Sequence, residues 1–329
     1  MNRRDTILLS ALVLLTSISC CTVIARAQAS LPGKPMGDMS TSELTKRADA
    51  GDPAAQNELG VRYGLGFDVP KDPERAIEWF KKAASQGYGK ARFNLAAAYF
   101  NDAGARENQS VAFQWFLLAE EVGDPNGKDG VSRMQSEMSA RDRNAAYILV
   151  GDRYQNGTDV KQDYGRAMQW YRKGADGGDG AACERIASLY ALGRGVPQDN
   201  SEILHWLQRG AELGDPLAAY DLGRAYEKGA AVPQDGGKAV KLYEQSAAYN
   251  NRKSLFALGN LYLDGKVVPQ NQEKALMWFL LAARYGDSAA GEKAAKLSAQ
   301  LPPKQVEKAK QDAKRYVSLQ KQPLALTQK

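Results

Sequence analysis

Histidine and cysteine are nearly absent from this sequence of 329 residues, which contains one histidine and three cysteines. Zinc sites and the cysteine–histidine or serine–histidine pairs of many enzymes need several such side chains. Only Cys183 and His205 lie beyond the first 29 residues, so no intramolecular disulfide bond is expected there. We predict that Cys183 is a small packing residue and that His205 faces solvent. The sequence therefore predicts a protein without catalytic residues, metal ligands or a cofactor.

Long apolar runs are also scarce, and the one candidate lies at the N-terminus. Two arginines at residues 3–4 precede the mostly apolar residues 7–18, and small residues surround cleavage positions after Ala27 or Ala29. This order of basic, apolar and small residues is typical of a secretory signal peptide. We therefore predict a signal peptide over residues 1–29, a periplasmic or secreted mature protein, and no integral membrane segment after its removal.

Two other interpretations of this leader stay open as weaker alternatives. Lipid could be attached at Cys20 or Cys21, although the residues before both cysteines fit a lipoprotein signal poorly. The paired arginines at residues 3–4 also invite a twin-arginine interpretation, but the sequence DTILL that follows them matches it poorly. Cleavage as an ordinary secretory signal peptide, without lipid attachment, fits the residues of this leader best.

Positive charge gathers at the C-terminal end of a chain whose formal net charge is +6 at pH 7. Residues 304–329 hold seven Lys/Arg and two Asp/Glu, and the repeats described below are nearly neutral. A nucleic-acid partner usually requires a stripe of Lys/Arg on the folded body. We therefore expect a solvated last helix and no nucleic-acid partner.

Aromatic residues recur at a fixed spacing. Six tyrosines are separated by 36 residues, with one spacing of 55, and each tryptophan follows one of them by sixteen. The tyrosines are Tyr63, Tyr99, Tyr154, Tyr190, Tyr226 and Tyr262, and the tryptophans are Trp79, Trp115, Trp170, Trp206 and Trp278, with Leu242 in the sixth place. Apolar or small residues precede each tyrosine by four and by eight, which marks one face of a helix. All five tryptophans belong to the repeated pattern, so none remains for a site that occurs only once in the chain.

A second helix follows in each repeat. Asp or Asn stands where an N-cap is needed, at Asp72, Asn108, Asp163, Asp199, Asp235 and Asn271. Residues that tolerate a left-handed conformation stand where the second helix should end, at Gly87, Gly123, Gly178, Gly214, Asn250 and Gly286. Each repeat is therefore predicted to be a helical hairpin.

The turn between the two helices can be mistaken for a phosphate-binding loop. In ALGRGVPQD, residues 191–199, two glycines and Arg194 precede a helix, as they would in such a loop. Similar sequences recur in the other repeats, and most lack an arginine at this place. We therefore interpret Gly193 as the end of the first helix, Pro197 as a barrier to its continuation and Asp199 as the cap of the second helix.

Three motifs together carry a family resemblance: A-x-x-x-L-G-x-x-Y, G-x-x-V-P-x-D and A-x-x-W-[FY]-x-x-A-A. With them, the chain resembles the Sel-one-like repeat (SLR) family, relatives of the tetratricopeptide repeat, in a secreted or periplasmic bacterial type. The resemblance implies an all-α protein, an α/α superhelical solenoid of six helical-hairpin repeats. It also implies an interaction scaffold without shared catalytic residues.

The spacing of 55 predicts one inserted helix, and residues outside the repeats predict capping helices. Because one extra helix reverses the direction of an alternating array, we expect a bend at the insertion. The predicted segments are the signal peptide 1–29, a linker and half-repeat cap 30–50, repeats 1–2 at 51–124, the inserted helix 125–143, repeats 3–6 at 144–287, capping helices 288–321 and a tail 322–329.

A partner surface is predicted on the concave side of the solenoid, where stacked hairpins expose their first helices. The position two residues before the motif leucine should face that side, and it holds several aromatic residues. The predicted binding residues are Phe93, Tyr220, Arg224, Phe256 and Asn260. Such side chains suit a protein or peptide segment, although the rings could instead pack against the next repeat.

Two other functions stay open as alternatives to a scaffold that binds a protein or peptide on the concave face. The chain could be a structural component of the bacterial envelope that assembles through its caps. It could also be an enzyme that acts on cell-wall material, although the sequence offers few candidate catalytic residues for this function. We expect a non-catalytic interaction protein.

Overall fold

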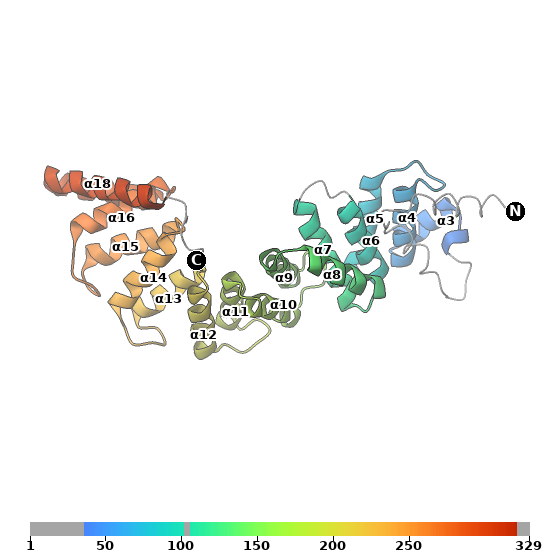
Figure 1. The fold of residues 1–329 in the computed structure, drawn as a ribbon, viewed down its shortest axis with the longest axis horizontal. Helices are drawn as coiled ribbons and strands as arrows, with labels where there is room; N and C mark the ends of the chain where they lie inside the picture. The colour runs from blue at the N-terminus through green and yellow to red at the C-terminus, as the bar shows by residue number, and fades with distance from the viewer. Residues whose placement is uncertain (1–35, 102–105, 321–329) are drawn as a thin grey trace. The chain divides into compact units, whose positions relative to one another are not determined.

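The structure, a computed structural model, describes residues 36–101 and 106–320 (Figure 1). All regular elements in these residues are helical: one 3-10 helix and sixteen α-helices. The fold class is the all-α hairpin solenoid that the sequence predicts. Within the described ranges, no helix is long and apolar enough to cross a membrane. The predicted signal peptide, Cys20 and Cys21 lie outside the described residues.

The helices form two compact units, one through Asp163 and the other from Tyr164 onward. The division separates the first and second helices of the third repeat. The boundary between the compact units lies one helix further along the chain than the inserted helix. The bend expected at the insertion stays a prediction.

The first unit is a series of α-helices in which each of the first five packs against the next one along the chain. Its elements are η1 (Met36–Asp38), α3 (Thr41–Asp49), α4 (Pro53–Leu65), α5 (Pro73–Ser85), α6 (Gly89–Asn101), α7 (Arg106–Glu121), α8 (Pro125–Glu137) and α9 (Ala140–Asn156). The inserted helix is α8, which buries Val131 and Met134. Helix α7 packs against both α8 and α9. Residues 140–143, which we expected in the inserted helix, instead form the first turn of α9.

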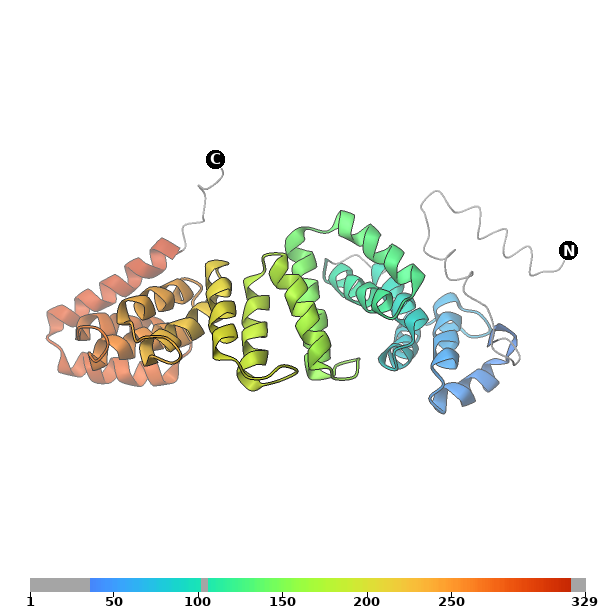
Figure 2. The same ribbon diagram turned by 90° about the horizontal axis from the view of Figure 1, so that it is seen from below.

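The second unit continues with α10 and ends with two capping helices (Figure 2). Its elements are α10 (Tyr164–Asp176), α11 (Gly180–Leu192), α12 (Asn200–Glu212), α13 (Pro216–Lys228), α14 (Gly236–Ala247), α15 (Arg252–Asp264), α16 (Gln272–Arg284), α17 (Ser288–Gln300) and α18 (Pro303–Gln320). Both α17 and α18 pack against α16. The last hairpin is therefore covered by α17 and α18 together.

The predicted helix ends are largely present. All six residues expected at the ends of second helices have positive φ, including Asn250 at 61°. Asp72, Asp199, Asp235 and Asn271 cap second helices as predicted. Asn108 does not, because α7 already begins at Arg106. The turn of the second repeat lacks the Val-Pro pair, and the good helix formers Arg106 and Glu107 extend the helix at its start.

Close contact between hairpins requires the small residues that the repeat places there. The position four residues after each tryptophan, or after Leu242 in the fifth repeat, is buried in all six repeats. At Gly210, a Cβ atom would lie 2.7 Å from the Cβ of Ala218, closer than two carbon atoms can approach. Trp206, four residues earlier on the same helix, is 8% exposed, so the aromatic and small positions of α12 both lie in the core.

A repeated glutamine, absent from our motif, closes the turn between the helices. The side-chain amide of Gln198 donates a hydrogen bond to the carbonyl of Ala191, seven residues earlier, at 2.9 Å. Gln162, Gln234 and Gln270 make the same bond at 2.7 to 2.8 Å. These bonds satisfy carbonyl groups at the end of each first helix. The predicted ending of α11 at Gly193, with φ 63°, is also present.

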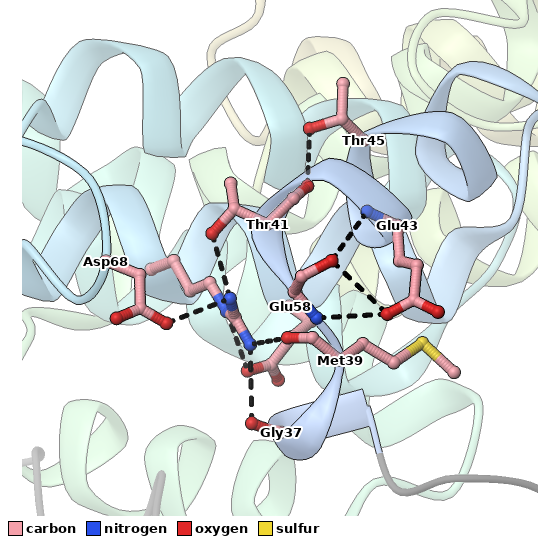
Figure 3. Close-up of polar contacts among 9 residues, drawn as sticks. Gly37, Met39, Thr41, Glu43, Thr45, Glu58 and Asp68 are labelled. Atoms are coloured by element: carbon pink, nitrogen blue, oxygen red, sulfur yellow. Dashed lines mark hydrogen bonds and ion pairs between the residues drawn. The ribbon is translucent and has the colours of Figure 1, made fainter.

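The N-terminal cap is held by a buried arginine (Figure 3). Arg62 of α4 is 1% exposed. It donates hydrogen bonds to the carbonyls of Gly37 at 3.3 Å and Met39 at 2.7 Å, and to the hydroxyl of Thr41 at 2.9 Å. Asp68 lies 3.3 Å from the same guanidinium group. The half-repeat cap is therefore attached to the first repeat by hydrogen bonds to its main-chain carbonyl groups as well as by apolar packing.

Candidate interaction surface

The predicted binding residues of the second unit lie on two consecutive first helices. Tyr220 and Arg224 are on α13, and Phe256 and Asn260 occupy the equivalent places on α15. Arg224 is exposed, and the other three are half-buried. Tyr220 and Phe256 both pack against the same core cluster. Neither ring is fully enclosed, so both retain accessible surface for a partner.

Phe93 does not have the exposed side chain that we expected. It belongs to the first unit and is 5% exposed. Its ring contacts Phe116, and the inserted helix α8 lies against that second ring: a Cβ on Gly130 would be 2.4 Å from Cδ1 of Phe116. The insertion therefore helps to bury this pair, and Phe93 is a core residue.

The same ring contact recurs in the second unit. The ring centroids of Tyr220 and Tyr243 lie 5.8 Å apart, and those of Phe256 and Phe279 lie 5.7 Å apart. Each partner ring follows the tryptophan position of its own repeat. A glycine of the first helix makes room for it: a Cβ on Gly259 would lie 2.5 Å from Cδ1 of Phe279. The predicted ligand rings are thus also packing residues, which was the alternative open at the sequence level.

A cation lies beside each half-buried ring. The guanidinium carbon of Arg224 is 5.7 Å from the ring centroid of Tyr220, and its Nη1 lies 3.3 Å from Oδ1 of Asp221. Both rings therefore have an electrostatic partner of the kind that aromatic faces attract. We define the α13–α15 surface by six residues: Tyr220, Asp221, Arg224, Phe256, Asn260 and Lys293.

Lys293, which the sequence analysis missed, supplies the second cation from α17. Its Nζ lies 5.2 Å from the ring centroid of Phe256 and donates a hydrogen bond to Oδ1 of Asn260. Helix α17 lies outside the six repeats, but it follows α16 as a further first helix would. The repeat spacing did not point to Lys293, because the residue 36 positions after Phe256 is Glu292.

Burial affects the ionisation of the tyrosines in and beneath this surface. Burial raises the pKa of Tyr220, and burial followed by the hydrogen bond to Glu227 raises the pKa of Tyr243. Both phenols therefore stay protonated at neutral pH. At the equivalent place on α11, burial also raises the pKa of Glu184, an effect opposed by Arg185 at 2.8 Å. The α13–α15 surface thus presents two cations, one carboxylate and two rings.

The two residues with the greatest potential for chemistry lie in different surroundings. Cys183 is fully buried, and burial raises the pKa of its thiol to about 11, so little of the reactive thiolate forms at neutral pH. His205 is exposed on α12, as predicted. Within the described ranges, no group of three or more His, Cys, Asp or Glu side chains could hold a metal ion.

Comparison with known proteins finds the repeat in six places. The model of the Sel1 repeat matches residues 53–88, 89–124, 144–179, 180–215, 216–250 and 252–287. The first four ranges have equal lengths and correspond to hairpins in the structure, with α8 in the interval between the second and third ranges. More than half of the chain is matched in this way.

Several individual proteins are similar to parts of the chain. An uncharacterized protein of Neisseria meningitidis is 26% identical over 170 residues, which are 46% of this chain and 35% of that protein. The secretory immunoglobulin A-binding protein EsiB of Escherichia coli is 39% identical over 57 residues, which are 17% of this chain and 11% of EsiB. The matched part thus spans about a third or less of these two relatives.

A solved structure with the same kind of repeat is also similar. A protective antigen of uropathogenic Escherichia coli, described as displaying an SLR fold, has 28% sequence identity and a TM-score of 0.48. The similarity covers 84% of this chain and 64% of the antigen.

Proposed function

Because the chain belongs to the Sel1 repeat family, whose members generally mediate protein–protein interactions, we propose that it is a non-catalytic scaffold of the bacterial cell envelope. It binds a protein or peptide segment on the first helices of its second unit. The observation that carries this proposal is the α13–α15 surface, where Tyr220 and Phe256 are half-buried and each lies beside a cation.

This combination suits a polypeptide ligand. Aromatic residues and arginine are enriched at the centres of protein interfaces, where a rigid ring contributes area at a low cost in conformational entropy. Here the rings are already fixed by Tyr243 and Phe279, so binding need not order them. Arg224, Asn260 and Lys293 add polar groups that can bond to a peptide backbone.

The place of action is proposed from the leader. A basic start, an apolar stretch and small residues predict export. A similar protein, EsiB, is named for binding secretory immunoglobulin A, so an extracellular protein is within the class of partner that we propose here. The ligand of this chain is a protein segment of its own envelope or of its surroundings.

Site-specific photo-crosslinking of the full chain in its native cells tests the proposal. A photoreactive residue replaces Arg224 in one variant and Asn260 in another, and a control variant carries it at Lys241, which is exposed on the second helix α14. We expect both test positions, and not the control, to crosslink the same protein. Adding Phe256→Ala should reduce that crosslink.

Other outcomes separate the alternatives. Crosslinks only between copies of this chain would support a structural component that assembles with itself. Equal crosslinks from Lys241 and from the two test positions would contradict a localised binding surface.

A further inference from the structure

Helix α18 uses its apolar side entirely within the second unit. Ala309 is fully buried, Ala313 and Val317 are each 9% exposed, and the helix packs against α16. Tyr316 meets Trp278 edge to face, with ring centroids 5.2 Å apart. In Figures 1 and 2 this helix is the red element along the last hairpin. Its apolar stripe is therefore not available to a membrane or to another protein.

Away from this stripe, α18 carries an excess of exposed positive charge. Four exposed cations on it form no ion pair with any described residue: Lys304, Lys310, Lys314 and Arg315. We call this set the outer face of α18. Lys308 differs, because its Nζ bonds to Oε1 of Glu273 on α16. Glu307 is exposed and helical spacing places it between Lys304 and Lys314, and Asp312 is half-buried. With five cations and two carboxylates, the helix still has an excess of positive charge.

The four cations follow one straight element. At a rise of about 1.5 Å per residue, Lys304 and Arg315 are separated by roughly 16 Å along the helix axis. Like charges at this density repel one another, and an anionic surface laid along the helix would relieve that repulsion. The four cations thus distribute positive charge along the axis of the helix.

We propose that the outer face of α18 binds the headgroups of anionic lipids and holds the second unit at a membrane surface. A protein partner fits this face poorly, because the centres of protein interfaces are depleted of lysine and rich in aromatic residues. The outer face has no exposed ring. Leu319, 58% exposed one turn beyond Arg315, is the sole large apolar side chain exposed on α18 among the described residues.

The proposed contact is peripheral. Lysine and arginine residues near an anionic surface are attracted to it within a Debye length. Four such residues can hold a protein there without a spanning segment. The α13–α15 surface lies on other helices of the same unit, so the two proposals do not depend on each other.

Vesicle co-sedimentation of the full chain tests the proposal, with vesicles of phosphatidylcholine alone and vesicles that also contain phosphatidylglycerol. The test variant carries Lys304→Gln, Lys310→Gln, Lys314→Gln and Arg315→Gln. The control variant loses the same charge at four exposed cations elsewhere in the second unit, by Arg172→Gln, Lys228→Gln, Lys241→Gln and Lys253→Gln. Both variants keep the N-terminal leader, so its own affinity for lipid cancels in the comparison.

We expect the unmodified chain to prefer the anionic vesicles and to lose that preference as salt is added. The test variant should partition at least about tenfold more weakly, and the control variant should behave like the unmodified chain. Equal losses in both variants, or no preference for the anionic vesicles, would overturn the proposal. Binding to duplex DNA as tight as to the vesicles would assign the face to polyanions in general and would equally overturn it.

Discussion

Phe256 and Phe279 lie with ring centroids 5.7 Å apart and planes at 54°, and Phe93 and Phe116 repeat this contact at 5.7 Å and 50°. The first ring of each pair stands at the position predicted to face a ligand. Phe256 is half-buried whereas Phe93 is buried. In these two pairs the same repeat position serves packing, and it keeps an accessible surface in the pair against which no inserted helix lies.

The two rings of the α15–α16 pair should separate stability from binding. Phe279 is fully buried, so Phe279→Ala should lower the free energy of unfolding by roughly 3 to 5 kcal/mol. Phe256→Ala should cost less, because part of its ring already faces solvent, and it should weaken partner binding by about 1 to 2 kcal/mol. Denaturant unfolding and a binding titration with the crosslinked partner measure the two effects. Arg224→Ala serves as the control that affects binding without affecting stability.

Trp206 should behave as a core residue. It is 8% exposed, and its indole N–H donates to Oε2 of Glu202 at 3.0 Å. We expect Trp206→Ala to cost roughly 3 to 5 kcal/mol through lost burial and the cavity that remains. Hydrogen exchange should show the loss spreading to the neighbouring hairpins, because repeats stabilise one another. A loss below about 1 kcal/mol would contradict the burial.

Arg194, in the turn that resembles a phosphate-binding loop, should be dispensable. Its side chain is exposed, and its guanidinium carbon lies 5.5 Å from the ring centroid of Tyr164. Arg194→Ala should change the free energy of unfolding by no more than about 1 kcal/mol. Calorimetric titration with inorganic phosphate should detect no binding that depends on this residue. Phosphate affinity that disappears in the variant would show that the turn is a binding loop after all.

Arg62 should determine whether the N-terminal cap stays attached. Arg62→Met removes hydrogen bonds to the carbonyls of Gly37 and Met39 from a buried site, so we expect a loss of about 3 kcal/mol. Amide exchange across α3 should accelerate. Arg75→Met is the matched control, because the Arg75 side chain is exposed and its guanidinium group donates to the hydroxyl of Tyr63 at 3.3 Å. Similar losses in both variants would contradict the anchoring role.

Cys183 should make the stability of the protein depend on alkaline pH. Burial raises the pKa of its thiol from 9.0 to about 11, so the native state retains a proton that the unfolded state releases. The contribution of this retained proton to the free energy of unfolding is fully present below about pH 9 and is lost as the pH rises toward 11. The loss amounts to roughly 2 to 3 kcal/mol. Unfolding titrations of the protein and of Cys183→Ala should diverge over this range, and alkylation of the native thiol should be slow at pH 8. Rapid alkylation at that pH would contradict the burial.

The sequence by itself determined the local structure of this protein. Its spacing of 36 residues predicts the hairpins, and Gly193 and Asp199 predict the turn, because helix ends depend on the conformational freedom and hydrogen bonds of a few neighbouring residues. The failure at Asn108 has the same local basis, since the second repeat lacks the residues that delay its helix. The buried tryptophans also follow from periodicity alone.

Only the tertiary structure decided which surface positions remain accessible. Phe93 and Phe256 are equivalent in the repeat, but α8 lies against the ring pair of one and Lys293 from α17 lies beside the other. Arg62 is buried because the preceding cap folds over it, and Lys308 differs from Lys310 because only the former reaches Glu273. Exposure and pairing depend on helices distant in the sequence, and a repeat pattern describes each hairpin without its neighbours.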